Sequence, residues 1–343
     1  MKLLVTGGTG FLGLAIVRQL CSYGHSVVTF SRGKHPEMES LQVNHIQGDL
    51  ADFQRLKDAM LGCEGVIHVG AKTGIWGKYQ DFFLTNVVGT ENVLKACRES
   101  GIRNLVFTSS PSVIFDGKGS EGKNESLPYP NKYSAWYPKT KALAEILVMS
   151  ANDENLKTVC LRPHLIWGPE DCHFLPRLLE KAKKGNLRIL GKSPNLVDTI
   201  YIENAAKAHI QALDQLIRNP KPVEGKTYFI SQDEPIPLED FMNSLIGVGG
   251  YAPVTKRLSP ILARISGRIL EASYQLFGVQ KEPILTLFLA QQLSTPHWYD
   301  ISAAKRDFGY RPEITFEEGL KRLTAWYTAK NDRETNENIL YND

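Results

Sequence analysis

Short apolar runs alternate with segments of helical periodicity through the first half of the chain. Apolar runs bounded by polar residues or glycine predict strands, and apolar residues spaced three and four apart predict helices. On this basis strands are expected at residues 3–7, 26–30, 43–47, 65–70, 104–110 and 158–163. Helices are expected at residues 11–23, 53–61, 82–98 and from about Pro138 to residue 150. This alternation predicts an α/β fold with a doubly wound parallel sheet and right-handed crossovers.

The second half of the chain has a different pattern. Glycine and proline interrupt it from about residue 166 onward, and only residues 200–213 are expected to return to the sheet. We therefore predict a sheet domain of residues 1–165 and 196–218, and a smaller lobe of residues 166–195 and 219–329. Residues 330–343 are polar, and a tail of that kind is expected to fray.

Three glycines lie between the first predicted strand and the first predicted helix. Gly7, Gly10 and Gly13 form the GGTGFLG segment. Glycine permits a tight turn there and lets backbone N–H groups approach a pyrophosphate, while the helix N-terminus adds partial positive charge. Because a strand precedes the segment and a helix follows it, we predict a dinucleotide-binding domain of the Rossmann type instead of an ordinary turn.

The end of the second strand bears on the choice of cofactor. Proteins that bind NAD commonly place an acidic residue there to accept from the ribose 2′-hydroxyl. Here Ser31 and Arg32 occupy that place, and an arginine can bind a 2′-phosphate through two hydrogen bonds. NADP(H) is therefore expected in preference to NAD(H); the alternative is that Arg32 is a solvated surface residue. Asp49 is a candidate acceptor for the adenine amino group, or else an N-cap for the next helix.

Tyr137 and Lys141 form the pair of side chains with the clearest chemistry. They are four residues apart on a predicted helix, so they share one face. A neighbouring ammonium favours phenolate, and we expect Lys141 to lower the Tyr137 pKa so that the tyrosine exchanges a proton with a carbonyl oxygen. The segment TSSPS places Ser109, Ser110 and Ser112 at the carboxyl end of a strand, where open α/β sheets bind ligands.

Taken together, these segments resemble one known family, the extended short-chain dehydrogenase/reductases. The similar segments are TGGTGFLG (6–13), GDL (48–50), VIHVGAK (66–72), FLTNVVGTENV (83–93), VFTSSPSVIF (106–115), YPKTK (137–141) and RPHLIWGP (162–169). They cover nearly the whole chain. Two departures are Gly70, where the family often has alanine, and Ser31-Arg32 in place of the common acidic strand ending.

The resemblance implies roles for individual residues. Ser110, Tyr137 and Lys141 match the catalytic triad of the family, and Lys141 there also bonds the nicotinamide ribose. Asn86 matches a structural asparagine. The cofactor-binding residues expected from the motifs and the resemblance are Gly7, Gly10, Phe11, Leu12, Gly13, Ser31, Arg32, Asp49, Leu50, Gly70, Ala71, Lys72, Asn86, Tyr137, Lys141, Pro163 and Ile166.

Within that family, several sequence motifs of this chain are similar to those of the 3β-hydroxysteroid dehydrogenase-like branch. The segments concerned are GAKTGIWG (70–77), SSPSVIFDG (109–117), LRPHLIWGPED (161–171) and HWYDISAAKRDFGYRP (297–312). The likeness is nearest to bacterial 2-alkyl-3-ketoalkanoate reductases of olefin biosynthesis, which implies reduction of a ketone on an apolar substrate. Sterol dehydrogenases share many of the same sequence motifs. A non-catalytic NADP-binding regulator is disfavoured because the Ser, Tyr and Lys set is intact, and a sugar-nucleotide epimerase because no clear basic clamp for a nucleotide diphosphate is present.

Aromatic residues are the main candidates for an apolar substrate site. For each aromatic residue, the alternative to substrate binding is ordinary packing in the core. For His164, the alternative is a place in a buried polar network. The candidate substrate residues are Trp76, Ser112, Trp136, His164, Trp167 and Tyr201.

Composition narrows the partners. The 343 residues carry 40 Lys and Arg against 37 Asp and Glu, and this small positive excess predicts no nucleic-acid partner. The five cysteines form no CxxC pair, so no metal site is expected and reduced thiols are favoured. The sequence shows no export signal and no 18-residue apolar run, which favours a cytoplasmic protein.

Residues 259–293 are the most apolar part of the smaller lobe. The segment is compatible with a lobe core, with a contact between two copies of the chain, with a lid over a fatty substrate, or with a helix on a membrane surface.

Overall fold

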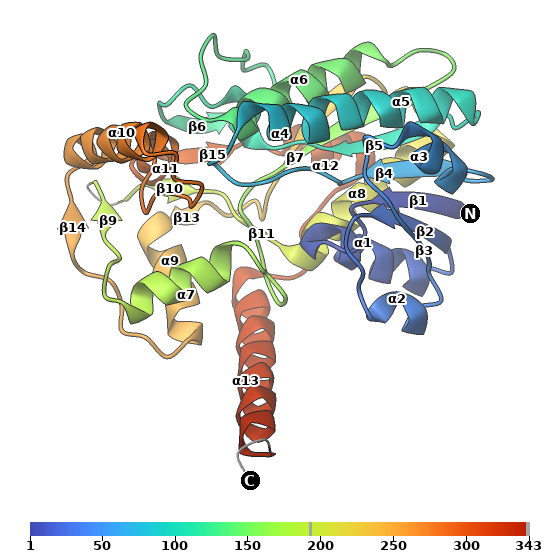
Figure 1. Ribbon diagram of the computed structural model, residues 1–343. Coiled ribbons are helices and arrows are strands. Elements are labelled where there is room, and N and C mark those ends of the chain that lie inside the picture. The colour runs from blue at the N-terminus through green and yellow to red at the C-terminus, as the bar shows by residue number, and fades with distance from the viewer. Residues whose placement is uncertain (192–193, 341–343) are drawn as a thin grey trace.

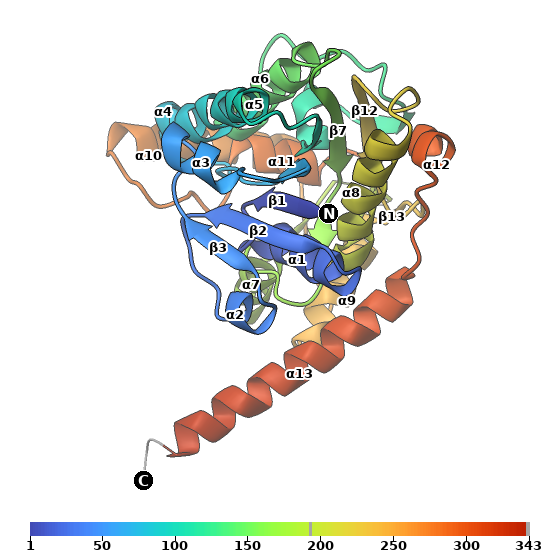
Figure 2. The same ribbon diagram turned by 90° about the vertical axis from the view of Figure 1, so that its right-hand side faces the viewer.

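A computed structural model describes residues 1–191 and 194–340. Its centre is a seven-stranded parallel sheet in the order β12-β7-β5-β4-β1-β2-β3, which confirms the predicted fold class (Figures 1 and 2). The strands are β1 (Lys2–Thr6), β2 (Ser26–Ser31), β3 (Asn44–Gln47), β4 (Gly65–His68), β5 (Asn104–Thr108), β7 (Lys157–Pro163) and β12 (Lys226–Ile230).

Helices cover both faces of this sheet. Side chains alternate along each strand, so that Leu3 and Val5 join one buried cluster while Leu4 joins the other. One face packs against α1 (Phe11–Ser22) and α8 (Ile202–Arg218), with α2 (Glu37–Ser40) at its edge. The other face packs against α3 (Phe53–Ala59), α5 (Gly89–Glu99) and α6 (Trp136–Ser150).

The order of the strands reverses between β1 and β4, and Gly7 and Gly70 follow these two strands. A Cβ on Gly7 would lie 2.8 Å from the Gly70 Cα, and Gly7 has φ +69°. Only glycine allows the two backbone segments that follow β1 and β4 to approach each other this closely in that conformation. Since open α/β sheets bind ligands where the strand order reverses, the fold places the ligand site here.

The smaller lobe lies beside the carboxyl ends of the strands (Figure 1). A four-stranded sheet in the order β13-β10-β15-β6 and the strand pairs β8–β11 and β9–β14 build it. Its strands are β6 (Ser120–Lys123), β8 (Ile166–Trp167), β9 (Ile189–Leu190), β10 (Leu196–Val197), β11 (Ile200–Tyr201), β13 (Ile236–Pro237), β14 (Arg257–Leu258) and β15 (His297–Tyr299). Its helices are α7 (Phe174–Lys183), α9 (Leu238–Val248), α10 (Pro260–Leu276) and α11 (Leu287–Leu293).

The division of the chain differs from the prediction at several strands. Residues 120–123 and 196–197 were assigned to the sheet domain, but β6 and β10 belong to the four-stranded sheet of the smaller lobe. Residues 226–230 were expected in the smaller lobe, but β12 pairs with β7 and forms the edge of the large sheet, with α12 (Ser302–Phe308) against it. Residues 200–201 were expected to return to the large sheet, but β11 pairs with β8. A two-residue strand such as β11 carries no periodicity, and the pairing of β12 with β7 joins residues more than 60 positions apart, which the sequence pattern does not record.

The last described segment is helical. Helix α13 spans Phe316–Leu340 and projects away from the body of the molecule in both views, whereas a frayed tail was expected from residue 330 (Figures 1 and 2). No helix among the described residues is both long and apolar enough to cross a membrane.

The predicted helix at residues 82–98 is a longer composite. It begins with α4 (Tyr79–Phe83), continues through the π-helical turn η1 (Leu84–Val88) and ends as α5. A π turn widens a helix by one residue and is frequent at functional sites. Here the turn carries Asn86 into the protein interior.

Candidate active site

A cavity of about 750 Å³ lies between the large sheet and the smaller lobe. Its volume is within the range typical of small-molecule and cofactor sites. It takes in every predicted cofactor residue except Asn86, and also Ser110. Thirty-two residues line it, among them Thr9, Thr73, Gly74, Thr108, Ser109, Leu165, Asp171, His173, Phe174 and Arg177.

The glycine turn forms one end of this cavity. A Cβ on Gly13 would lie 2.1 Å from the Gly7 carbonyl oxygen, so no side chain fits there. Gly10 precedes α1, and no side chain caps the N-terminus of that helix. The first N–H groups of a helix lack partners within it, and the helix dipole favours an anion beside them. The cradle therefore fits the pyrophosphate of a dinucleotide.

The end of β2 forms the adenosine side of the cavity. The Ser31 hydroxyl lies 2.8 Å from the Thr9 hydroxyl, and the Arg32 carbonyl accepts from the Gln47 amide at 2.8 Å. The Arg32 side chain is 67% exposed and stands 3.9 Å from the Asp49 carboxylate. Arg32 thus places an exposed cation at the edge of the cavity.

Asp49 was predicted either to cap the next helix or to face the cofactor. The cap of α3 is Asp52, whose carboxylate accepts from the Arg55 N–H at 3.1 Å. Asp49 accepts from the Ala51 N–H at 2.9 Å and lines the cavity.

Tyr137 and Lys141 lie one turn apart at the start of α6, as their spacing predicts. Ser110 lies two residues after the end of β5 and caps the short 3₁₀ helix η2 (Pro111–Ile114), where its hydroxyl accepts from the Ser112 N–H at 3.2 Å. The Ser110 hydroxyl is also hydrogen-bonded to Tyr137. The Lys141 ammonium donates to the Thr108 carbonyl at 2.6 Å and lies 4.0 Å from the centre of the Phe107 ring. The three predicted catalytic residues therefore meet on one wall of the cavity.

The pKa shifts at this wall correct one expectation. Burial raises the pKa of Tyr137 above its ordinary value, and the hydrogen bond with Ser110 opposes that rise. Burial also lowers the pKa of Lys141 to about 7, since desolvation penalises the ammonium. The expectation that Lys141 lowers the Tyr137 pKa is therefore wrong for the cofactor-free protein. Desolvation is the larger effect because both groups are buried and Lys141 bonds to a carbonyl.

Asn86 stabilises the cavity from behind. Its side-chain oxygen accepts from the Lys72 N–H at 2.7 Å, and its amide donates to the Lys72 carbonyl at 3.1 Å and to the Thr140 hydroxyl at 3.0 Å. It is 1% exposed and does not line the cavity. Asn86 thus joins the segment after β4 to α6 beside Lys141; the expected direct cofactor contact is replaced by a positioning role.

A buried histidine next to this group escaped the sequence analysis. His68 bonds through Nδ1 to the Thr6 hydroxyl at 2.6 Å and through Nε2 to the Thr90 hydroxyl at 3.0 Å. Thr6 in turn accepts from the Gly70 N–H at 3.1 Å. Burial lowers the pKa of His68 to about 3, so the ring is neutral and holds the ends of β1 and β4 together. A single histidine in a strand gives no signal of such a network.

Trp167 and Tyr201, two of the predicted substrate residues, lie in the core. They are 1% and 0% exposed, and their rings are 5.3 Å apart. Trp167 also packs 5.1 Å from Phe316 at the start of α13. Neither residue lines the cavity, because the chain after residue 300 returns to cover them.

The other predicted substrate residues surround the cavity without lining it in this conformation. His164 is buried with its ring centre 4.9 Å from that of His297, and neither Nδ1 has a hydrogen-bond partner. Trp136 is 41% exposed beside Tyr137, and Ser112 donates to Ser110 at 2.9 Å. The Trp76 indole donates to the Val279 carbonyl at 3.3 Å.

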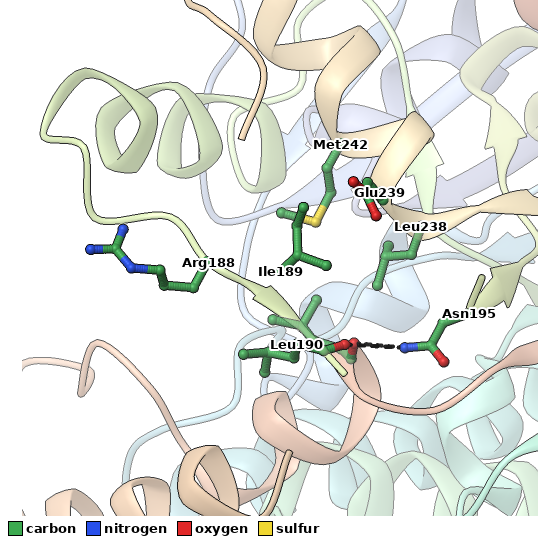
Figure 3. Close-up of a pocket in the computed structure, with 8 residues that line it drawn as sticks. Arg188, Ile189, Leu190, Asn195, Leu238, Glu239 and Met242 are labelled. Atoms are coloured by element: carbon green, nitrogen blue, oxygen red, sulfur yellow. Dashed lines mark hydrogen bonds between the residues drawn. The ribbon is translucent and has the colours of Figure 1, made fainter. Parts of the chain in front are cut away.

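A second, much smaller pocket lies in the smaller lobe among β9, α9 and α11 (Figure 3). Its volume of about 20 Å³ is enough for roughly one water molecule. It carries no substrate site. Among the described residues no three His, Cys, Asp or Glu side chains gather as metal ligands.

Comparison with known proteins agrees with this geometry. Residues 4–258 match the model of the 3-beta hydroxysteroid dehydrogenase/isomerase family. The chain is 46% identical over 328 residues to the 2-alkyl-3-oxoalkanoate reductase of Shewanella oneidensis, and the aligned region covers 94% of this chain and 85% of that relative. It is 33% identical over 323 residues to the human sterol-4-alpha-carboxylate 3-dehydrogenase, decarboxylating, covering 93% and 86% respectively.

Solved structures match the fold. The UDP-glucuronic acid 4-epimerase from Bacillus cereus in complex with NAD is 22% identical, with a TM-score of 0.73 over 96% of this chain and 99% of that one. A structure described as gox2253 is 23% identical, with a TM-score of 0.76 over 96% and 98%. At this identity the likeness shows a shared architecture alone.

Proposed function

Since this chain belongs to the 3-beta hydroxysteroid dehydrogenase/isomerase family of NAD(P)-dependent oxidoreductases, we propose that it reduces 2-alkyl-3-oxoalkanoates to the 3-hydroxy acids. The observation that carries the proposal is the meeting of Ser110, Tyr137 and Lys141 on the wall of a cavity that begins at a pyrophosphate cradle. The relatives named for this activity, at 46% and 47% identity, support the choice of substrate.

The reaction adds two electrons and two protons across a carbonyl group. The reduced nicotinamide, when bound, supplies hydride to the carbonyl carbon. Ser110 donates its hydroxyl hydrogen bond to the carbonyl oxygen and holds it beside Tyr137. The Tyr137 hydroxyl gives its proton to that oxygen as the C–O double bond becomes single, and the phenolate later recovers a proton from water. The raised pKa of Tyr137 keeps the hydroxyl protonated at neutral pH, which suits reduction.

Lys141 lies one helical turn after Tyr137 on α6 and assists it. Its ammonium donates to the Thr108 carbonyl and, because it lines the cavity, has further donors to offer to a cofactor ribose. When it is charged, it stabilises the phenolate left after proton transfer. Asn86 fixes α6 at Thr140 and so holds Lys141 at this depth.

We further propose that NADP(H) is preferred over NAD(H). Arg32 supports this choice because it reaches the adenosine end of the cavity with an exposed guanidinium, and Ser31 stands where an acidic residue would repel a 2′-phosphate.

The surface of α10 supports an apolar substrate and suggests how the substrate arrives. Ile261, Ile265 and Ile269 follow one another at four-residue spacing and are 70%, 49% and 61% exposed. The lobe-core alternative is therefore wrong for this face alone, because Ala263 of α10 and Ala290 of α11 are fully buried in a core cluster. Arg268 on the same helix is exposed, whereas Arg264 donates to the Ser294 hydroxyl at 3.3 Å. Apolar side chains and one basic side chain are thus presented together, as suits an anionic lipid surface. We propose that this face of α10 rests on such a surface.

A sterol is the second candidate substrate, because the human sterol relative covers 93% of this chain. A panel of substrates at fixed NADPH decides between the two. We expect kcat/KM to rise by about three- to fourfold for each added methylene of a 2-alkyl-3-oxo acid series until the channel is full, since each buried CH₂ contributes about 0.8 kcal/mol.

The same panel includes a 3-ketosteroid and a UDP-sugar. Turnover of the steroid with no dependence on acyl length would replace the proposal by a sterol dehydrogenase. Activity confined to the UDP-sugar would overturn both.

A further inference from the structure

The linker between α10 and α11, residues 277–286, is here termed the strap; it joins the two walls of the cavity. On one side the Trp76 indole donates to the Val279 carbonyl at 3.3 Å, from the loop that also supplies Thr73 and Gly74 to the cavity lining. On the other side the Lys181 ammonium, on α7, donates to the Ile284 carbonyl at 3.1 Å. The strap therefore links two elements that contribute residues to the cavity wall, although none of its own residues lines the cavity.

Arg177 makes the charged contact of the strap. It is on α7, lines the cavity, and its Nη1 lies 3.1 Å from each carboxylate oxygen of Glu282. The two side chains are 58% and 27% exposed. An ion pair this exposed contributes little to stability, so another anion can replace Glu282 at small cost.

Arg177 differs from the other cations of the cavity wall. Arg32 is at the adenosine end, Lys72 lies 3.5 Å from the Asp81 carboxylate, and Lys141 is committed to Thr108. Arg177 is the one arginine or lysine that the smaller lobe contributes to this wall among the described residues.

We propose that Arg177 binds an oxyanion of the bound ligand and that Glu282 is an internal stand-in which that oxyanion displaces. The inference rests on the proposed function for the identity of the oxyanion, which is the carboxylate of the 3-oxo or 3-hydroxy acid or the diphosphate of the cofactor. Arginine suits both because its planar guanidinium forms paired hydrogen bonds with carboxylate and phosphate. Displacement of Glu282 releases one attachment of the strap, so ligand binding and strap position are coupled.

Two single variants separate this exchange from a structural ion pair. Arg177→Gln and Glu282→Gln each abolish the same contact, so a purely structural pair predicts that both variants change ligand affinity in the same direction. Exchange predicts opposite directions: Arg177→Gln weakens the ligand by about tenfold, and Glu282→Gln, which removes the competitor, tightens it. In the double variant the effect of Glu282→Gln disappears.

Three measurements distinguish the sources of the oxyanion. The Kd of NADPH is measured by fluorescence titration without substrate, and kcat/KM is measured with NADP⁺ for a 2-alkyl-3-hydroxy acid and for its methyl ester. Opposite changes for the acid and none for the ester assign the carboxylate. Opposite changes in the NADPH Kd assign the cofactor diphosphate.

Arg188→Gln is the matched control, because Arg188 lies beyond α7 in the same lobe and points away from the other residues of the small pocket (Figure 3). It should change none of the three values. Changes of the same sign in the Arg177 and Glu282 variants, or no change in any value, overturn the inference. A wild-type protein inactive on the acid removes the proposed function instead, and the NADPH titration still tests Arg177.

Discussion

At the scale of single residues, Tyr137 gives the most direct test of the mechanism. Tyr137→Phe keeps the ring in its buried position beside Ser110 and deletes only the hydroxyl, so folding and NADPH affinity should persist. Turnover should fall by about 10²-fold or more because no other group takes over the proton transfer. Initial rates with the 3-oxo acid measure this change.

The chain offers a matched control for that substitution. Tyr133 is also on the approach to α6, and its hydroxyl donates to the Val113 carbonyl at 2.9 Å. Tyr133→Phe removes a hydroxyl from the same neighbourhood, and we expect it to leave turnover within a few-fold of wild type. Near-normal turnover in a folded Tyr137→Phe protein would remove Tyr137 from the mechanism.

The proposed preference for NADP(H) also depends on a single side chain, the Arg32 guanidinium at the edge of the cavity. Arg32→Ala should weaken NADPH by tenfold or more, since loss of a charge-assisted contact costs about 1.5–3 kcal/mol. NADH, which lacks the 2′-phosphate, should bind equally to both proteins. Calorimetric titration of both cofactors checks this, and equal NADPH affinity in the two proteins would refute the proposed preference.

At the scale of elements, α10 presents an exposed apolar face. The function of this face depends on whether a lipid surface or a second copy of the chain covers it. We expect the protein to float with vesicles that contain anionic lipid, and to be released by salt because the exposed Arg268 contributes to the attraction. Ile265→Glu together with Ile269→Glu should abolish flotation, since both side chains are largely exposed on that face.

Leu61→Glu is the control for this experiment. Leu61 is 62% exposed but follows α3, in the sheet domain, so the added charge should leave flotation unchanged. If the wild-type protein ignores vesicles and sediments as a dimer that the α10 variants dissociate, the face belongs to a second copy of the chain.

At the scale of the whole molecule, buried neutral histidines should make stability fall steeply in acid. Burial lowers the pKa of His68 to about 3, of His209 and His297 to about 4, and of His164 well below its ordinary value. These rings stay neutral when folded but take up protons below about pH 6.5 when unfolded, so the stability they contribute at neutral pH is lost as the pH falls. Asp198 acts in the opposite direction, because burial raises its pKa to about 7 and the folded protein already holds that proton.

From these five groups we expect a net uptake of about three protons on unfolding near pH 5, which corresponds to a loss of about 4 kcal/mol per pH unit. Guanidinium unfolding at pH 7, 6 and 5 measures this slope. His209→Gln should reduce it by about one proton, while His173→Gln, on the surface, should not. A slope below one proton per molecule would show that these histidines become charged without unfolding.

Local chemistry determined much of this protein before any tertiary contact was known. The glycine turn, the helix after it and the Tyr137–Lys141 pair depend on residues close in sequence, so spacing alone placed Gly7, Gly13 and Lys141 on the cavity. The parallel sheet was also predictable, because alternating strands and helices allow few other arrangements.

Tertiary structure decided what depends on distant contacts. Trp167 and Tyr201 became core residues because α13 packs over them, and Arg177 meets Glu282 across 105 positions of the chain. The direction of the Tyr137 pKa shift was likewise beyond the sequence, since it depends on how deeply α6 is buried. Burial and long-range pairing are properties of the assembled chain, and a linear pattern of residue types does not contain them.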